Sequence, residues 1–328
     1  MPRHATVLMS TALLSLCTLA EGQRMYWAES SDLTDRIRRA NLDGTDVEDL
    51  VASGLLGPRG IAVDPLRGKV YWTDPAEDRI QRANLDGSAV ETIVTEHLLG
   101  PHGIDIDPAS GKLYWTTDSN LHGIQRSNLD GTGIETLLTD GLVYPYAIAL
   151  DVAGGKMYWS DTNTHKIQRA DLSGGNLEDL VTTTGGIYGI AVDPNGGKVY
   201  WTEVNNEVIR RGNLDGTNPE HLVTELGGPE SGPTGIALDL DAGKMYWCDW
   251  GAHRIQRANL ELPTGETPAN RTDIEDLVTG LDEPQDIALV LDLQPVPAIS
   301  TWGLAVFGLV VSAAGTVLIR QHRLALTA

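Results

Sequence analysis

The chain has 328 residues, of which 41% are hydrophobic and 21% are charged, so most of it can fold around a core. Its 45 acidic residues outnumber its 24 basic residues, and the net charge of −21 argues against phosphate-mediated nucleic-acid binding and against docking on anionic lipid. Only two cysteines are present, Cys17 and Cys248, and with Cys17 in a leader the mature protein would have no internal disulfide.

Residues 1–20 are typical of a signal peptide. Arg3 and His4 provide a short basic start, an apolar run follows, and Ala20 ends a cleavage site of small residues. A buried first strand or helix would also be apolar, but the turn residues and alternating charge that would support it are missing. We therefore expect this segment to direct export.

A Tyr-Trp pair recurs six times along the middle of the chain, at intervals of 42 to 46 residues. Each unit carries four short strand signals, which in the second unit cover residues 60–64, 69–72, 80–85 and 91–94. Turn residues such as Asp86-Gly87 separate the strands. Four antiparallel strands in about 44 residues are typical of a propeller blade. The six tryptophans are Trp27, Trp72, Trp115, Trp159, Trp201 and Trp247.

The order of the strand signals predicts how the ring closes. Neighbouring residues of a strand point to opposite faces, so Tyr and Trp can each fill one of the two spaces beside a blade. The first unit opens at its Tyr-Trp strand, and the last inner-strand signal, residues 286–290, has no Tyr-Trp pair after it. We therefore expect an all-β fold over residues 21–292: a six-bladed β-propeller of four-stranded antiparallel blades, closed by the C-terminal strand in the N-terminal blade.

These units resemble the LDL-receptor class B, or YWTD, repeat. The motif is clearest at Tyr71-Trp72-Thr73-Asp74 and at Tyr158-Trp159-Ser160-Asp161, with Ile-x-Arg and Leu-Asp-Gly downstream. The first and third copies depart from it at Ala28-Glu29 and Thr117. The resemblance implies a six-bladed propeller that serves as a binding platform rather than as an enzyme.

Repeated polar residues raise the question of catalysis. An Asp recurs at strand ends beside turn residues, as at Asp64, and an Arg recurs in Ile-x-Arg, as at Arg82; turn capping and contacts between blades or at the rim account for both. Asp105 replaces a repeated Ala and is either a lone metal ligand or a structural hydrogen-bond acceptor. We expect no catalytic residue, no metal and no cofactor, with a channel-centred, lactonase-like metal hydrolase as the alternative.

The binding hypothesis rests on positions that differ from unit to unit. The residues just before the inner strands should ring one mouth of the channel, and the loops after the second strands lie on the same face. Aromatic residues and Arg dominate binding hot spots. Unconstrained loops would also vary. The proposed anchors are Tyr146, Tyr188 and Trp250, with polar contacts from Arg59 and His102, and the loops add Asn205, Asn206 and His253.

The C-terminus carries a second apolar segment. Residues 302–319 are just long enough to cross a bilayer as a helix, and the basic residues in 320–328 favour a cytoplasmic end. With the proline-containing linker 293–301, this segment resembles the bacterial IPTL-CTERM sorting signal, which implies processing by an exosortase-like membrane enzyme; a plain single-pass anchor is the alternative. The matching residues are Pro297, Ser300, Trp302 and Gly303.

Taken together, these features predict an exported bacterial protein at the cell envelope or cell surface. Its partner would be an extracellular protein, peptide or glycan, and not a nucleic acid. A structural component of an extracellular matrix, without a discrete ligand, is a further alternative.

Overall fold

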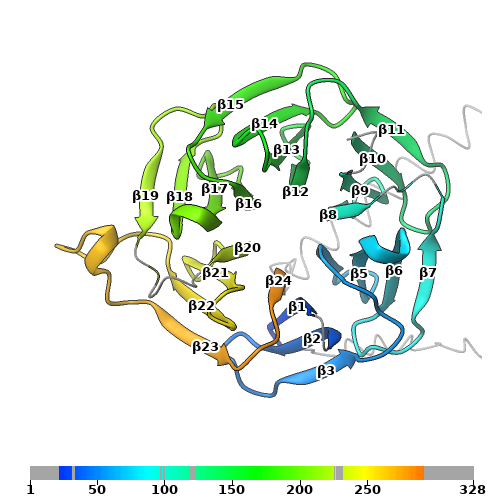
Figure 1. Cartoon of the computed structure of the whole chain (residues 1–328), viewed down its shortest axis with the longest axis horizontal. Coiled ribbons are helices and arrows are strands. Elements are labelled where there is room, and N and C mark those ends of the chain that lie inside the picture. The colour runs from blue at the N-terminus through cyan, green and yellow to red at the C-terminus, as the bar shows by residue number, and fades with distance from the viewer. Residues whose placement is uncertain are drawn as a thin grey trace, which may run out of the picture. The chain divides into compact units, whose positions relative to one another are not determined.

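The computed structural model describes residues 22–291, except 32–33, 97, 99, 119–122, 225 and 227–231. Six four-stranded antiparallel sheets form a ring around a central axis (Figure 1), which confirms the predicted propeller. The expected signal peptide (1–20) and the expected linker, apolar segment and basic tail (293–328) lie outside the described residues. Within the part of the chain that is described, no helix is long and apolar enough to cross a membrane.

The first three blades each contain four strands, named from the innermost to the outermost. Blade 1 contains β24 (Pro284–Val290), β1 (Arg24–Ser30), β2 (Asp35–Asn41) and β3 (Glu48–Val51). Blade 2 contains β4 (Ile61–Asp64), β5 (Lys69–Asp74), β6 (Arg79–Asn84) and β7 (Glu91–Val94). Blade 3 contains β8 (Pro101–Asp107), β9 (Lys112–Thr117), β10 (Gly123–Asn128) and β11 (Glu135–Leu138).

The other three blades have the same order of strands. Blade 4 contains β12 (Pro145–Asp151), β13 (Lys156–Asp161), β14 (Lys166–Asp171) and β15 (Glu178–Thr182). Blade 5 contains β16 (Ile187–Asp193), β17 (Lys198–Glu203), β18 (Val208–Asn213) and β19 (Glu220–Val223). Blade 6 contains β20 (Pro233–Asp239), β21 (Lys244–Asp249), β22 (Arg254–Asn259) and β23 (Glu275–Thr279).

The ring closes as the strand order predicts. The last strand, β24, pairs antiparallel with the first strand, β1, so that Trp27 lies opposite Ile287 and Tyr26 lies opposite Ala288. The two ends of the repeat region are therefore joined in one sheet, which supplies the innermost strand that blade 1 lacks in its own segment of sequence. Pairing with β24 covers the inner edge of β1, so that blade 1 begins with an innermost strand as the other blades do.

The hydrophobic core is divided into six clusters, one between each pair of neighbouring blades. Each cluster combines the Tyr of one blade with the Trp of the next, as Tyr71 does with Trp115 and Tyr26 with Trp72. These tryptophans are fully buried. The prediction that Tyr and Trp fill opposite faces of the same blade is confirmed, because their side chains alternate across the strand.

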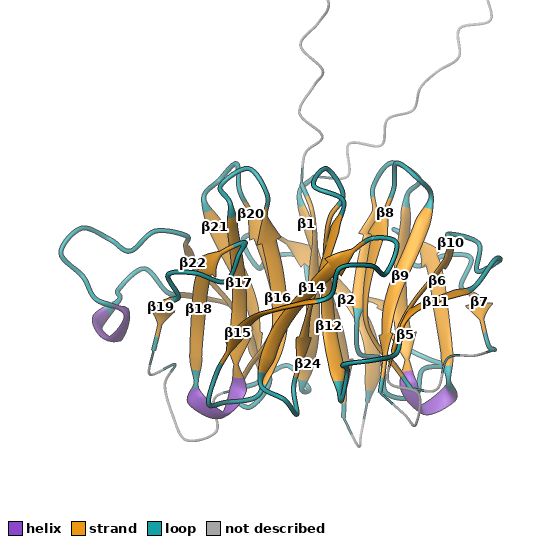
Figure 2. Ribbon diagram, turned by 90° about the horizontal axis from the view of Figure 1, so that it is seen from above, coloured by secondary structure: helices purple, strands orange, loops and turns teal. Residues whose placement is uncertain are grey.

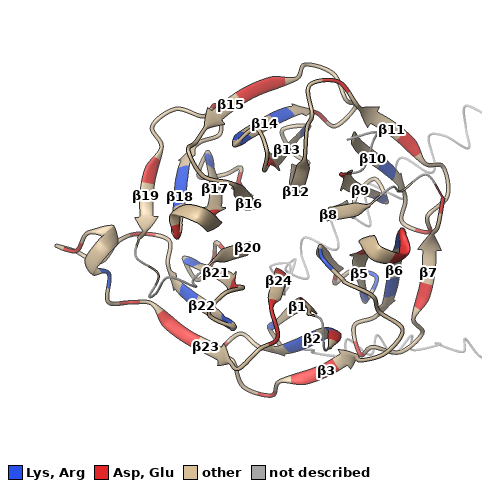
Figure 3. Ribbon diagram, viewed as in Figure 1, with Lys and Arg blue, Asp and Glu red and all other residues tan. Residues whose placement is uncertain are grey.

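The repeated arginines link neighbouring blades. Arg82 donates to the carbonyl oxygen of Leu129 in the next blade at 2.8 Å and to Glu91 of its own outer strand at 2.7 Å. Arg257 closes the circle by donating to Leu42 at 3.0 Å. The arginine in each of the six blades makes this bond to a Leu carbonyl of the following blade, which confirms the predicted structural role. The acidic partners lie on the outer strands (Figure 3).

The aspartates at the ends of the inner strands cap turns, as expected. Asp64 accepts a hydrogen bond from the backbone amide of Arg67 at 3.1 Å, and Asp239 accepts one from the amide of Ala242 at 2.9 Å. Asp107, Asp151 and Asp193 make equivalent contacts. These carboxylates stabilise the turns that face away from the mouth.

The indole N–H groups are satisfied in two ways. In blades 2, 3, 4 and 6 the acceptor is a Gln on the adjacent strand, as for Trp159, which donates to Gln168 at 3.1 Å. In blades 1 and 5 the acceptor is a Glu at the fourth motif position, and Trp201 donates to Glu203 at 3.0 Å. In these two blades an Arg replaces the Gln, and Arg210 pairs with Glu203 at 3.1 Å. The Glu at the fourth motif position is therefore accompanied by an Arg on the adjacent strand in both blades.

In four of the six blades, a hydroxyl group at the third motif position joins the blade to its neighbour near one end of the channel. Thr116 accepts a hydrogen bond from the amide of Gly103 at 2.9 Å and donates to the carbonyl oxygen of Tyr146 in the next blade at 2.6 Å. Thr73, Ser160 and Thr202 do the same in their blades. Ala28 and Cys248 lack this hydroxyl; Ala28 lies in blade 1, which contains the closing strand, and Cys248 lies in blade 6, next to it. Cys248 is buried.

Replacing Thr116 with Val should test this junction. The change keeps the shape of the side chain but leaves a buried amide and a buried carbonyl without their shared partner. We expect the free energy of unfolding to fall by about 2 kcal/mol, measured by denaturant unfolding. Ser160→Ala in the next blade should have an effect of similar size. A fully stable Thr116→Val variant would contradict the proposed contribution of this hydroxyl.

The two ends of the ring carry different structures. The short helices η1 (Pro75–Glu77) and η2 (Val204–Asn206) lie on one face, and the tight turns after the inner strands lie on the other (Figure 2). A longer loop in blade 6, which contains η3 (Pro268–Asn270), projects from the circumference. We call the face with η1 and η2 the mouth face.

Candidate functional site

The residues expected at the mouth lie closer to the strands than predicted. His102, Tyr146 and Tyr188 belong to the inner strands rather than to the loops before them; Arg59 alone of the four precedes its strand. In each of these three strands the register shifts at this point, so that two residues lie opposite one. A bulge of this kind redirects a side chain. The sequence showed strong β patterning only beyond the bulge, which explains the misplaced strand starts.

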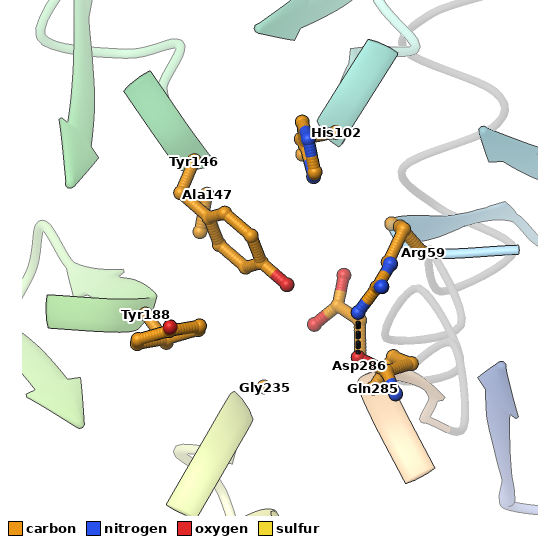
Figure 4. A pocket seen from close by; sticks show the side chains of 11 residues that line it. Arg59, His102, Tyr146, Ala147, Tyr188, Gly235, Gln285 and Asp286 are labelled. Atoms are coloured by element: carbon orange, nitrogen blue, oxygen red, sulfur yellow. Dashed lines mark hydrogen bonds between the residues drawn. The ribbon is translucent and has the colours of Figure 1, made fainter. Parts of the chain in front are cut away.

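Four of the predicted residues come together in a small cavity at the mouth, which we call the mouth cavity. Its volume is about 20 Å³, room for about one water molecule. Arg59 donates to Oε1 of Gln285 at 2.5 Å, and the Tyr146 ring points toward the centre (Figure 4). The side chains nearly fill this end of the channel, so a large ligand would rest on the mouth. The residues lining it include Arg59, His102, Tyr146, Tyr188, Gln285 and Asp286.

The aromatic residues at the mouth form a continuous shelf. The rings of Tyr146 and Tyr188 meet edge to face with centroids 4.8 Å apart, and His102 lies 4.8 Å from Tyr146 on its other side. Tyr144 extends the shelf, 6.3 Å from Tyr146. Such ring pairs restrain one another's orientation. The hydroxyl junctions of Thr116 and Ser160 hold the backbone beneath this shelf.

His102 is fixed by a carboxylate. Its Nε2 lies 2.7 Å from Oδ2 of Asp118 and 3.4 Å from the Tyr144 hydroxyl. Burial opposes ionisation of Asp118, but the hydrogen bonds from His102 and Tyr144 outweigh it and lower the pKa of this carboxyl. Burial and the neighbouring Asp118 raise the pKa of Tyr144. Nδ1 of His102 is buried without a hydrogen-bond partner among the described residues.

The other predicted residues lie on the loops after the second strands, outside the mouth cavity. Trp250 is 41% exposed, and its indole N–H donates to Glu283 at 3.1 Å. Asn205 and Asn206 are exposed and support the η2 loop: the first accepts from the amide of Gly186, and the second donates to Glu203. His253 is exposed in a loop, with a positive φ of 54°.

Three further residues belong to the mouth and were missed as site residues. Asp286 stands where four other blades have Gly and one has Ala, a difference that was visible in the sequence. Asp118 follows Thr117, so in blade 3 the motif acid is displaced by one position toward His102. Tyr144 was visible as a tyrosine outside the motif, but its contact with His102 required the fold.

Asp105 is a structural hydrogen-bond acceptor. Its two oxygens accept from the amide of Ile106 at 2.7 Å and from the amide of Leu150 in the next blade at 2.8 Å. Burial raises its pKa to about 6, although both amide bonds oppose the shift. Across the described part of the chain, no group of three or more His, Cys, Asp or Glu side chains is arranged to hold a metal ion.

Several proteins share parts of this sequence or its fold. A segment of 53 residues is 47% identical to mouse low-density lipoprotein receptor-related protein 5, and one of 51 residues is 41% identical to mouse nidogen-2. These segments cover 16% and 15% of this chain but only 3% and 4% of the relatives. This chain therefore matches a small part of each relative's length.

Solved structures and a sequence family extend the likeness over the whole ring. A chain of a nidogen/laminin complex superposes with a TM-score of 0.70 at 24% identity, covering 82% of this chain and 99% of the other. A putative TolB from Agrobacterium tumefaciens gives 0.59 at 14% identity, over 78% and 89%. The sequence pattern of one family, virginiamycin B lyase, matches residues 16–294, which include all six blades and the mouth. The chain therefore belongs to the virginiamycin B lyase family.

Proposed function

We propose that this protein is an exported, surface-associated propeller whose mouth face binds a protein, peptide or glycan without a covalent step. The observation that carries the proposal is the convergence of Arg59, His102, Tyr146 and Tyr188 at the mouth cavity. Inter-blade hydrogen bonds to the backbone carbonyls of the last three hold them in place. Aromatic residues and Arg on a rigid surface are the residue types that dominate binding energy.

A partner protein is favoured over a glycan by two further features. Arg59 forms no ion pair with a carboxylate among the described residues, so its charge is available to an acidic group of a partner. The chain also resembles nidogen and a receptor-related protein in sequence, and its fold resembles a chain of a nidogen/laminin complex. A complex between two proteins supports a protein as the partner of this chain too. Export and surface association rest on the sequence of the two ends.

Replacing Tyr188 or Trp250 with Ala should weaken a bound peptide. A displayed library of random peptides is panned against the purified protein, and the affinity of the selected peptides is measured by calorimetry. Each substitution should cost about 2 kcal/mol, or roughly thirtyfold in affinity, because it removes an aromatic anchor from the mouth face. Trp250 is tested separately because it lies outside the mouth cavity.

Leu66→Ala is the matched control. Leu66 is a 66% exposed apolar residue in the turn between β4 and β5, on the face opposite the mouth. Its loss should leave peptide affinity unchanged. Peptides that bind the Tyr188/Trp250 double variant as tightly as the parent protein would place the site elsewhere. Absence of saturable binding to peptides and to a glycan array would favour the matrix role.

An enzyme is the second candidate, supported by the family's name and by the contact between His102 and Asp118. A His fixed by a carboxylate is a common general acid or base. The hydrolase alternative is tested by measuring turnover of a panel of lactones and esters, with and without added divalent metal. Turnover that is lost in His102→Gln, a variant with unchanged unfolding, would establish an enzyme and displace the binding platform as the main function.

A further inference from the structure

Two spaces lie along the axis of the ring, and one charged residue borders both. Beyond the mouth cavity, the inner strands line an open chamber of about 330 Å³, bordered mainly by Ile, Val, Leu and Ala. Among the described residues, Asp286 is the one that lines both the chamber and the mouth cavity, and it is the one carboxylate in the lining of the mouth cavity. Ionisation of Asp286 therefore changes the electrostatic potential in both spaces.

Asp286 is held in place by the backbone of two blades. One carboxylate oxygen accepts from the amide of Ile287 at 2.9 Å, and the other accepts from the amide of Ile61 in blade 2 at 3.1 Å. The carboxyl group thus crosses the junction between blades 1 and 2, where Ala28 provides no hydroxyl. Asp105 has the same hydrogen-bonding pattern between blades 3 and 4, but it lines only the chamber and not the mouth cavity.

Among the described residues, no Lys or Arg side chain forms an ion pair with Asp286. Burial raises the pKa of Asp286 to about 7, the two amide bonds oppose this, and the negative charge of Asp105 adds to it. Glu29 on the adjacent strand is already neutralised by Arg38. The titratable and charged groups that share the mouth cavity with Asp286 or interact with it electrostatically are Arg59 before β4, His102 and Asp105 of β8, Tyr146 of β12, Tyr188 of β16 and Cys248 of β21.

The mouth residues respond to this charge. Tyr146 is half-buried, and its pKa is raised by desolvation, lowered by Arg59 and raised by Tyr188 and Asp286. Arg59 is bonded to Gln285, the residue immediately before Asp286. Asp286 and Arg59 line the same small cavity, so an ionised Asp286 places a negative charge close to the cation that a carboxylate ligand would use.

We propose that protonation of Asp286 switches the mouth between two states, one that accepts a carboxylate at Arg59 and one that rejects it. The switch rests on the proposed function, since it regulates the same surface. With Asp286 neutral, Arg59 can attract an anion; with Asp286 ionised, the two negative charges repel each other. By linkage, a bound carboxylate must in turn favour uptake of a proton by Asp286.

The first test uses the free protein. The Arg59 Nε–H and Tyr146 ring signals are followed by NMR from about pH 5 to about pH 9. Both should shift with a midpoint near 7, and the shift should disappear in Asp286→Asn. Should that variant fail to fold, Asp286→Ala is the second, since blade 4 carries Ala147 at the same position. Asp105→Asn is the matched control: the titration at the mouth should persist, with its midpoint moved to lower pH because the negative charge of Asp105 is lost. Mouth signals that do not titrate, or that titrate alike without Asp286, overturn the proposal.

The second test uses acetate as the probe anion, since it remains ionised across this range. Its affinity, read from the Arg59 signal, should fall about tenfold from about pH 6 to about pH 8 in the parent protein and stay constant in Asp286→Ala. Equal affinity at both pH values overturns the switch while leaving the binding platform intact. If the selected peptides bind the Tyr188→Ala and Trp250→Ala variants as tightly as the parent protein, the proposed binding function is overturned, while the titration of the mouth by Asp286 is unaffected.

Discussion

Removing the closing strand should abolish cooperative unfolding. A chain that ends at Glu283 lacks β24, so β1 exposes its inner edge and the cores on both sides of blade 1 lose Ile287 and Val290. Exposed strand edges pair with other chains. We expect aggregation during purification, or a broad thermal transition in place of a single one, measured by calorimetry and by size-exclusion chromatography.

A chain that ends at Leu291 is the control, because it keeps β24 and loses only the residues after Leu291. It should stay monomeric and unfold in one transition. If the chain ending at Glu283 behaved in the same way, the pairing of β24 with β1 would contribute nothing to stability, and ring closure would have to come from elsewhere.

Exchanging the two kinds of hydrogen-bond acceptor for the Trp indole N–H group should reveal a strong energetic coupling between Glu203 and Arg210. Glu203→Asp alone shortens the side chain, so that Trp201 loses its acceptor and Arg210 loses its partner in a largely buried place. We expect the free energy of unfolding to fall by about 2–3 kcal/mol. The double variant Glu203→Asp with Arg210→Gln recreates the Asp-Gln combination of blades 2, 4 and 6. Its free energy of unfolding should lie within about 1 kcal/mol of that of the parent protein.

Denaturant unfolding of the two single variants and the double variant measures this coupling. The reverse exchange in blade 4, Asp161→Glu with Gln168→Arg, provides the matched comparison, because Gln168 there accepts from Trp159. Each single change in blade 4 should cost more than the pair. Additive effects in both blades would show that the Glu-Arg and Asp-Gln combinations are independent choices rather than alternative solutions for one buried N–H group.

The scaffold could be predicted from the sequence alone. The Tyr-Trp pairs, the Asp-Gly turns and the unmatched strand at residues 286–290 sufficed for the number of blades and for the closure, because alternation along a strand and short turns are local properties. The structural role of the repeated arginines, represented by Arg82, was also readable, since a charge present in every blade must serve every blade.

The arrangement of the residues at the mouth became visible only in the tertiary structure. The bulges that carry His102 and Tyr146 depend on a hydroxyl group of the same blade and a carbonyl of the next, and no local pattern encodes that contact. The meeting of His102 with Asp118 depends on a motif acid displaced by one residue. Asp286 was visible as an exception, but its place between two spaces follows only from closing the ring, since residues far apart in the chain form a shared axis only once all six blades are assembled.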